Sequence, residues 1–157
     1  MDKGEGFMRR AIELARQGMN SGSGGPFGAV VVREGEIIGE GWNQVVGSHD
    51  PTAHGEVVAI RDACSRLGDF SLAGAEIYTT GQPCPMCLGA IHWARISRIY
   101  FGFGIADAAT IGFDDREFFE EFTKPENERK VAATPLLTAE ALQLIAEYAA
   151  LPERTRY

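Results

Sequence analysis

Apolar side chains recur at helical spacing near the start of the chain, which predicts an amphipathic helix over residues 7–19. The glycine- and serine-rich segment Ser21–Pro26 then ends this helix. The apolar run Phe27–Val32 follows directly and predicts a buried strand. A turn over residues 33–36 leads into a second strand that ends near Asn43, so the two strands are expected to form a hairpin.

The rest of the chain alternates between helical and strand patterns. In chain order we expect a loop at Val45–Thr52, a helix at His54–Leu67 closed by Gly68, a strand at Glu76–Thr80, a helix from Pro83 to about Arg95, a strand at Ile99–Phe103, a helix at Arg116–Phe122, a strand at Val131–Leu137, and a helix at Ala139–Leu151 capped by Thr138. This order predicts an α/β fold with three layers, in which helices cover both faces of one mixed sheet of about five strands.

Composition and charge narrow the class of protein. The chain has 157 residues, of which 45% are hydrophobic and 24% charged, and this suits a single domain over residues 1–157. The net charge of −7 disfavours extended contact with phosphates, so we expect no nucleic-acid partner. No run approaches the roughly 20 apolar residues of a membrane-spanning helix, and the first residues do not look like a secretory signal. We therefore expect a cytoplasmic protein that does not enter a membrane.

Glycine divides the chain into two parts. It supplies 19 of 157 residues, and all of them lie at or before Gly112. The 45 residues after Gly112 contain none, so a turn-rich part is followed by a helical one.

Three cysteines are an odd number, which argues against a disulfide framework. Cys84 and Cys87 form a C-x-x-C at the predicted start of a helix, where the helix dipole favours the thiolate and so favours metal binding. By itself this motif also fits a redox pair, half of a structural zinc site or two unbonded thiols.

A second motif, His54-Gly55-Glu56, also lies at a predicted helix start. One histidine and two cysteines offer zinc three ligands and leave a fourth position for water, which is the pattern of a catalytic site. Cys64 belongs to an apolar stripe and is expected in the core, while His49 and His92 are expected on the surface, in the core or beside the pocket. A fourth ligand from Cys64 or His92 would instead indicate a binding module with a structural zinc.

Read together, His54-Gly55-Glu56 and Pro83-Cys84-Pro85-Met86-Cys87 have the pattern H-x-E…P-C-x-x-C of zinc-dependent nucleobase deaminases. On these motifs the chain resembles the cytidine-deaminase-like superfamily and, within it, the bacterial guanine deaminase family. The resemblance covers nearly the whole chain. Its other segments are residues 24–30, Asn43, residues 50–54, residues 83–90, residues 111–115 and the terminal Arg156-Tyr157.

The resemblance implies a role for each matching residue. His54, Cys84 and Cys87 would hold one Zn²⁺, Glu56 would move protons, and Asp115 would assist proton transfer to the leaving amine. The residues implied in holding the purine are Phe27, Asn43, Trp93 and Tyr157, with the backbone of Gly55 beside them. Tyr157 would enter the site of a second subunit, through exchange of a C-terminal arm over residues 113–157 in a homodimer.

The implied reaction is hydrolytic deamination of guanine to xanthine and ammonia, with a small nucleobase as the substrate. Two departures keep other substrates open: Gly55 replaces the alanine that is usual in the family, and Gly81-Gln82 replaces a frequent Cys-Glu. The alternatives are guanosine, a pterin, a triazine or cytosine. A tRNA adenosine deaminase shares the zinc motif, but it must bind phosphates, and this acidic chain lacks an obvious basic stripe.

Overall fold

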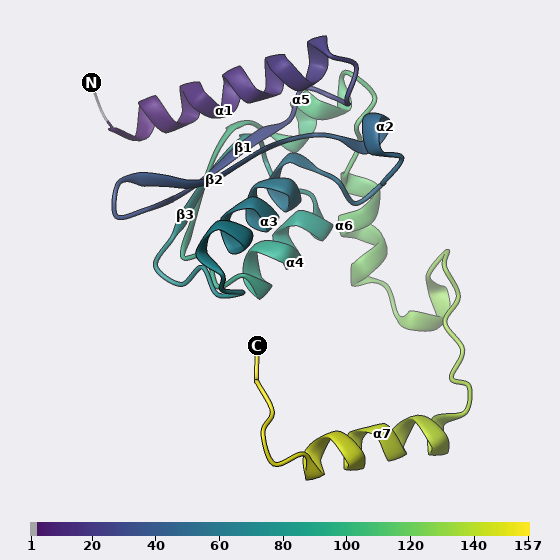
Figure 1. Cartoon of the computed structure of the whole chain (residues 1–157). Coiled ribbons are helices and arrows are strands. Elements are labelled where there is room, and N and C mark those ends of the chain that lie inside the picture. Colours follow the sequence, from purple (N-terminus) through teal and green to yellow (C-terminus); the bar gives the residue numbers. More distant parts are fainter. Residues whose placement is uncertain (1–2) are drawn as a thin grey trace. The chain divides into compact units, whose positions relative to one another are not determined.

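The computed structural model describes residues 3–157, with side chains from Gly4 onward, and it divides into two compact units. The first unit ends at Phe119 and the second is Glu120–Tyr157. The first unit contains one mixed sheet of four strands in the order β2-β1-β3-β4 (Figure 1). The strands are β1 (Gly28–Arg33), β2 (Glu36–Trp42), β3 (Glu76–Gly81) and β4 (Arg98–Phe103). β1 runs antiparallel to β2 and β3, whereas β3 and β4 are parallel.

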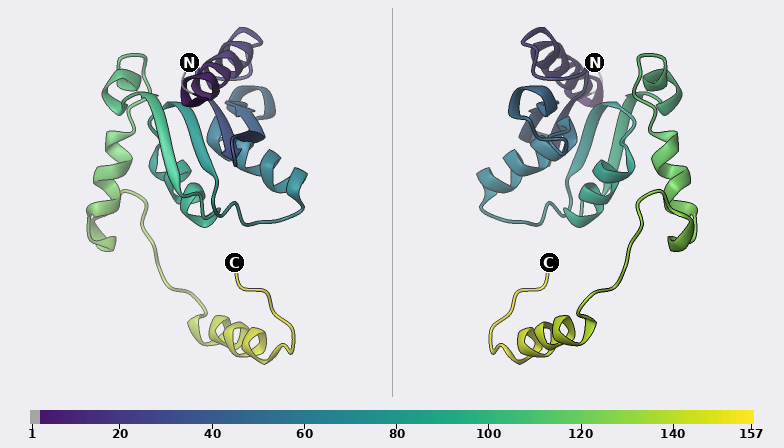
Figure 2. Two further views of the ribbon diagram at one scale, coloured as in Figure 1. Left: turned by 90° about the vertical axis from the view of Figure 1, so that its left-hand side faces the viewer. Right: turned by 90° about the vertical axis from the view of Figure 1, so that its right-hand side faces the viewer.

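Helices cover both faces of this sheet, so the predicted three-layer architecture is confirmed (Figures 1 and 2). The helices of the first unit, in chain order, are α1 (Lys3–Asn20), α2 (Val45–Ser48), α3 (Gly55–Leu67), α4 (Pro85–Trp93), α5 (Ile105–Ala109) and the start of α6 (Arg116–Thr123). On one face Val30 packs with Leu14 of α1, and on the other Val31 packs with Ala59 of α3 and Ile91 of α4. Because both sides of β1 are buried, its sequence is a continuous apolar run rather than an alternating one.

Small residues bring α3 unusually close to the sheet. A β-carbon built on Gly39 would lie 2.5 Å from the Ala59 carbonyl oxygen and 2.6 Å from Ala63 Cβ. One built on Gly41 would lie 2.5 Å from the Ala59 nitrogen. These contacts exclude any side chain at the two glycines, and they place the first turn of α3 directly against β2.

The predicted helices and strands of the first unit are confirmed, with ends displaced by a few residues. The hairpin turn has two residues with positive φ, Glu34 and Gly35, and Gly68 ends α3 in the left-handed conformation. The short helices α2 and α5 were not predicted, because four or five residues are too few to show a helical period.

The prediction of a fifth strand at Val131–Leu137 is wrong. In the second unit the described helices are η1 (Glu126–Glu128) and α7 (Thr138–Ala150), so this run has no strand beside it within that unit. Pro135 also lacks the N–H that a central strand must donate. Thr138 is the first residue of α7 rather than its cap, which is Leu137 with φ 52°.

The second unit exposes apolar side chains along α7. Leu142, Leu144, Ile145 and Tyr148 are all exposed, Ile145 by 67%. A helix that stays monomeric in water ordinarily buries such a face. Among the helices of residues 3–157, none combines the length and the apolar character that crossing a membrane requires.

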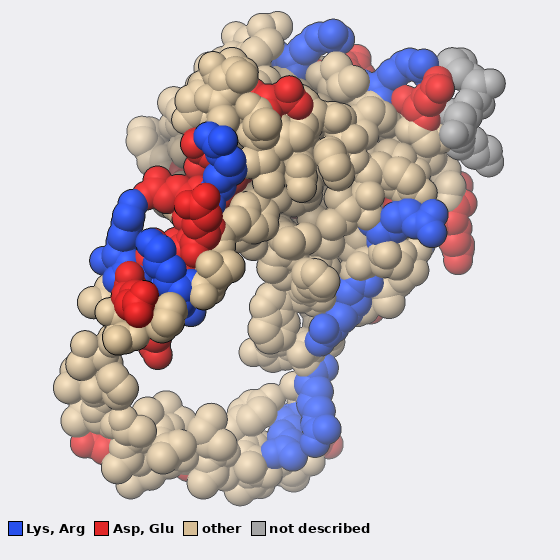
Figure 3. Space-filling view, turned by 180° about the vertical axis from the view of Figure 1, so that it is seen from behind, with Lys and Arg blue, Asp and Glu red and all other residues tan. Residues whose placement is uncertain are grey.

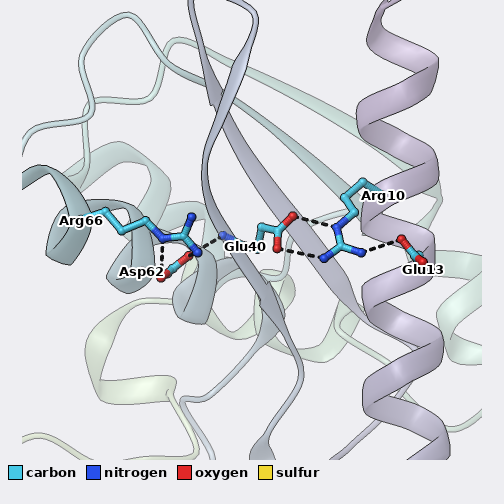
Figure 4. A network of polar contacts seen from close by, with 5 residues as sticks. All are labelled: Arg10, Glu13, Glu40, Asp62 and Arg66. Carbon is cyan, nitrogen blue, oxygen red and sulfur yellow. Dashed lines mark hydrogen bonds and ion pairs between the residues drawn. The ribbon is translucent and has the colours of Figure 1, made fainter.

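A chain of charged groups ties both helical layers to the edge strand β2 (Figure 4). Arg10 of α1 donates two hydrogen bonds to the Glu40 carboxylate, at 2.7 and 3.0 Å, and a third to Glu13 at 2.6 Å. The Glu40 backbone N–H donates to Asp62 of α3 at 2.8 Å, and Asp62 in turn pairs with Arg66. The bidentate bond with Arg10 lowers the pKa of Glu40.

We expect Arg10→Met to lower the free energy of unfolding at pH 7 by about 1–3 kcal/mol, because it leaves the half-buried Glu40 carboxylate without its charged donor. Since the pKa of Glu40 is lower in the folded state, its contribution is complete at neutral pH and is lost as the pH falls through that lowered pKa. The difference between wild type and Arg10→Met should therefore shrink below about pH 4.3. Urea unfolding at several pH values measures it.

Arg9→Met is the matched control, because Arg9 pairs with Glu5 and both side chains are 58% exposed. We expect that variant to change the free energy of unfolding by less than about 0.5 kcal/mol. Equal losses in the two variants would contradict the structural role of the Arg10–Glu40 pair.

Candidate active site

The two sequence motifs meet because each begins a helix that points its first turn toward the same place. His54 is the N-cap of α3, with φ −70° and ψ 154°, and Cys84 is the N-cap of α4, with φ −68° and ψ 169°. Pro85 follows as the first residue of α4, where its fixed φ suits a helix start. An N-cap residue is extended, so its side chain projects from the helix end rather than lying along the helix.

The ligand atoms of His54, Cys84 and Cys87 all lie within 4.8 Å of one another. His54 Nδ1 is 3.6 Å from Cys84 Sγ and 3.4 Å from Cys87 Sγ. Tetrahedral zinc, with bonds of about 2.3 Å to sulfur and 2.0 Å to nitrogen, separates sulfur and nitrogen ligands by roughly 3.6 Å. The donor types and their spacing therefore fit a zinc ion.

The other residues considered as a fourth ligand lie elsewhere. Among the described residues, the group contains one histidine and two cysteines. Cys64 packs against the hydrophobic cluster between α3 and the sheet, while His92 of α4 and His49 are exposed. The site therefore has the three-ligand composition of a catalytic centre rather than the four ligands of a structural one.

The polar groups at the helix starts shift one another's pKa values. The Cys87 thiol, and then His54, lower the pKa of Cys84 to about 4. The same contact with Cys84 raises the pKa of His54. Cys84 is therefore a thiolate at neutral pH, which is the form that binds metal.

Glu56 lies directly beside this group. It is only 4% exposed, and burial raises the pKa of its carboxyl. Thr79 Oγ1 of β3 donates to Glu56 Oε1 at 3.3 Å, and the Cys87 thiol donates to Oε2 at 3.3 Å. A buried carboxyl with a raised pKa is suited to accept and return a proton. Thr79 was not predicted, because a threonine in a strand has no sequence signal that marks this contact.

A cavity of about 200 Å³ opens at these residues. Its lining consists of Gly25, Phe27, Asn43, Val45, Val46, Pro51, His54, Glu56, Gln82, Cys84, Phe113 and Asp115. The structure thus brings together the predicted Phe27, Asn43, His54, Glu56 and Asp115 from distant parts of the sequence. Val45, Val46, Pro51 and Phe113 were not predicted as site residues, because only the fold shows which loop side chains turn inward. Gln82, noted from the sequence only as a departure from the family pattern, also lines the cavity. The volume lies below the 300–1,000 Å³ usual for drug-sized ligands and suits a small planar molecule.

Two polar residues of the cavity have defined orientations. Asn43 is buried, and its Oδ1 accepts the Val45 backbone N–H at 3.1 Å, so its NH₂ is the group offered to the cavity. Partial burial and then the charge of Cys84 raise the pKa of Asp115. The adjacent Asp114 instead pairs with Arg116 at 2.7 Å, which lowers the pKa of Asp114. Only the second of these two aspartates faces the cavity.

Three predicted site residues do not line the cavity of the described chain. Gly55 is buried against β1, where a β-carbon would lie 2.9 Å from the Phe27 carbonyl oxygen. Trp93 ends α4 and is 65% exposed, with the Arg95 guanidinium 6.0 Å from its ring centre. Tyr157 belongs to the second unit and is 73% exposed.

A three-layer fold with a His/Cys/Cys group and a buried glutamate beside it defines the class of zinc-dependent deaminases. Residues 1–103 match the family described as "Cytidine and deoxycytidylate deaminase zinc-binding region", and the chain belongs to this family. The resemblance drawn from the motifs is confirmed.

Individual relatives within this family include guanine deaminases and tRNA-specific adenosine deaminases. Guanine deaminase of Bacillus subtilis (strain 168) is 52% identical over 127 residues, covering 81% of each chain. The X-ray structure of a guanine deaminase from Bacillus subtilis matches with a TM-score of 0.93 and 45% identity, covering 98% of each chain. A tRNA-specific adenosine deaminase of Haemophilus influenzae is 41% identical over 117 residues, covering 71% of this chain and 67% of that protein.

We expect Cys84→Ala to abolish stable zinc binding, because two ligands without the low-pKa thiolate hold the ion weakly. Elemental analysis of purified protein should show about one zinc per chain in the wild type and far less in the variant. Cys64→Ala is the matched control and should retain zinc, since Cys64 lies in the hydrophobic cluster. A Cys84→Ala protein with full zinc content would contradict this ligand set.

Proposed function

We propose that this protein catalyses the hydrolytic deamination of guanine, which converts guanine and water into xanthine and ammonia. The observation that carries the proposal is the position of Glu56 within one small cavity that also contains the His54 and Cys84 ligand atoms. The Bacillus subtilis guanine deaminase, 52% identical to this chain, supports the choice of substrate.

Zinc bound by His54, Cys84 and Cys87 would lower the pKa of a water molecule, so that hydroxide is available near neutral pH. Glu56 accepts the proton of the attacking water and passes it to a ring nitrogen of the base. Its burial and its bond from Thr79 support this role, because the first raises its pKa and the second holds its carboxylate in place.

The other cavity residues orient the base and the leaving group. Phe27 and Phe113 form an aromatic wall on which a planar base can pack. The NH₂ of Asn43 donates to an acceptor atom of the base. Asp115, whose pKa is raised, passes the second proton of that water from the new hydroxyl to the departing amine, so that the carbon–nitrogen bond breaks, the carbonyl of xanthine forms and ammonia is released.

The cavity and the charge favour a free base over larger substrates. A ribose attached to the base adds volume that a cavity of about 200 Å³ does not easily hold, which disfavours guanosine. A tRNA substrate requires contacts with phosphates, and the net charge is −7. On the face in Figure 3, Lys and Arg side chains are scattered, and several lie beside Asp or Glu.

Purified zinc-loaded protein should release ammonia and xanthine from guanine, and Glu56→Gln should lower kcat by about 10²–10⁴-fold because the proton carrier is lost. Xanthine formation followed by absorbance measures the rate, and elemental analysis confirms that the variant keeps its zinc. A panel with guanosine, adenine, cytosine and a pterin tests the substrate. Guanine turnover no higher in wild type than in Glu56→Gln would refute the proposal.

Neighbouring aspartates supply a matched pair for the same assay. Asp115→Asn should lower kcat strongly, whereas Asp114→Asn should leave it nearly unchanged, because Asp114 pairs with Arg116. Similar losses in both variants would remove the argument for Asp115 as the second proton donor.

We also propose that the protein is a homodimer in which the C-terminal arm is exchanged beyond Asp115, with Tyr157 completing the partner's site. Phe113 and Asp115, at the start of the arm predicted over residues 113–157, line the cavity of their own chain. Support comes from the exposed apolar side chains of α7 and from the exposure of Trp93 and Tyr157. Trp93 as a purine contact stays a prediction within this arrangement. The cytoplasm is our proposed location, because a reducing compartment preserves the thiols of Cys84 and Cys87.

Deletion of Tyr157 should reduce guanine turnover by at least about tenfold while zinc content and dimer mass are retained, because only one contact to the base is removed. Light scattering during size-exclusion chromatography measures the mass. A monomeric wild type would contradict the exchange, and unchanged kinetics after the deletion would contradict the role of Tyr157.

A further inference from the structure

Two glycines flank the aromatic wall of the cavity. A β-carbon built on Gly25 would lie 2.9 Å from Phe27 Cε2 and 3.0 Å from Phe113 Cζ. One built on Gly81 would lie 2.7 Å from Phe103 Cε2 and 3.2 Å from Phe27 Cδ1. Carbon atoms in good contact are about 3.5–4.0 Å apart, so neither position accepts a side chain while the three rings keep their places.

The three rings are in contact through Phe27. Its ring centre is 5.0 Å from that of Phe113, at 88°, and 5.8 Å from that of Phe103, at 59°. The first pair is T-shaped and the second is tilted, and both arrangements are favourable. Phe27 and Phe113 line the cavity, whereas Phe103 lines a separate groove of about 310 Å³ against α1. Phe103 is not among the described residues that line the cavity. It supports the cavity wall from behind, through its contact with Phe27.

We propose that Gly81 is a positioning residue for the base: its missing side chain lets Phe103 seat against Phe27, and this contact sets the plane of the Phe27 ring. The inference rests on the proposed function, because the base that packs on Phe27 is the substrate. A methyl group at position 81 requires Phe103 to move by roughly 1 Å, from 2.7 Å to an ordinary contact distance. Phe103 can make that move only by changing its contact with Phe27, so the wall shifts.

Gly81 also has a second connection to the site. Its carbonyl oxygen lies 3.1 Å from Thr79 Oγ1, which is also 3.3 Å from Glu56 Oε1, so the single hydroxyl proton is shared between these two acceptors. A change that acted through Thr79 would disturb proton transfer and lower kcat. A change that acts through the Phe27 wall weakens the binding of substrate and product alike, so it raises KM with little effect on kcat.

The test is Gly81→Ala, assayed for kcat and KM with guanine and for xanthine affinity by calorimetry. We expect KM for guanine and Kd for xanthine to rise together by at least about fivefold, with kcat within about threefold of wild type, since a misplaced wall weakens binding. Gly6→Ala is the matched control, because a β-carbon there meets no atom within 4 Å. Its kinetic constants should equal those of wild type.

Rescue supplies the decisive comparison. Phe103→Leu removes the two ring atoms, at 2.7 and 3.1 Å, that a methyl group at position 81 would strike first, and leaves the looser 3.2 Å contact with Phe27 Cδ1. Gly81→Ala in the Phe103→Leu background should therefore change KM and xanthine affinity by less than about twofold. Should Gly81→Ala alone fail to fold, Phe103→Leu alone still tests the contact. Removal of the supporting ring should raise KM for guanine and Kd for xanthine while kcat is retained.

Three results would overturn the inference: unchanged KM and xanthine affinity in folded Gly81→Ala, a collapse of kcat at constant KM, or the same effect of Gly81→Ala in both backgrounds. A wild type without guanine turnover would refute the proposed function instead. In that case thermal unfolding still tests the Gly81–Phe103 contact on which the inference depends. Gly81→Ala must then lower Tm more with Phe103 present than with leucine at position 103, and equal losses would refute that contact.

Discussion

Two helix N-termini converge at the zinc-binding group, and the rest of the site is arranged around this meeting. Each N-terminus carries a partial positive charge of about one half, so their approach is unfavourable unless negative groups lie between them. The Cys84 thiolate at the start of α4 supplies that negative charge, and the carboxyl groups of Glu56 and Asp115 lie nearby. Zn²⁺ held by Cys84, Cys87 and His54 would neutralise the sulfur charge. Because His54 caps α3 and Cys84 caps α4, the same ion would also link the two helices.

The sheet sets where this meeting occurs. α1 covers one face of β1 and β3, so α3 and α4 pack on the other face. Gly39 and Gly41 let α3 approach the backbone of β2, and this brings Glu56 into the interior, where burial raises its pKa. The Arg10–Glu40 pair connects the opposite layer to the same edge of the sheet. Close packing in the core and the burial of Glu56 beside the cavity are therefore consequences of one arrangement.

Much of this could be predicted from sequence, where the signal is local. The cap positions of His54 and Cys84, the i, i+3 spacing of Cys84 and Cys87, and the buried run of β1 are all properties of short segments. The expected strand at Val131–Leu137 failed because strand formation depends on a neighbour, and none lies beside it in its own unit. Thr79 and Phe113 were not predicted for a related reason, since their places at the site come from contacts with residues far away in the chain.

The glycines show most clearly which properties the sequence predicts and which only the tertiary structure reveals. Their excess before Gly112 was visible in the composition and indicated turns. In the structure, several of these glycines instead lie where a neighbouring group comes too close for a side chain to fit. Gly39 lies against α3 in this way, and Gly81 lies against the Phe103 ring. The sequence by itself determined the class of fold, the ligand types and the candidate proton carrier, because helix caps, periodicity and motif spacing act over a few residues. Only the tertiary structure decided which side chains share the cavity and which rings support its wall, because those contacts join segments separated by tens of residues.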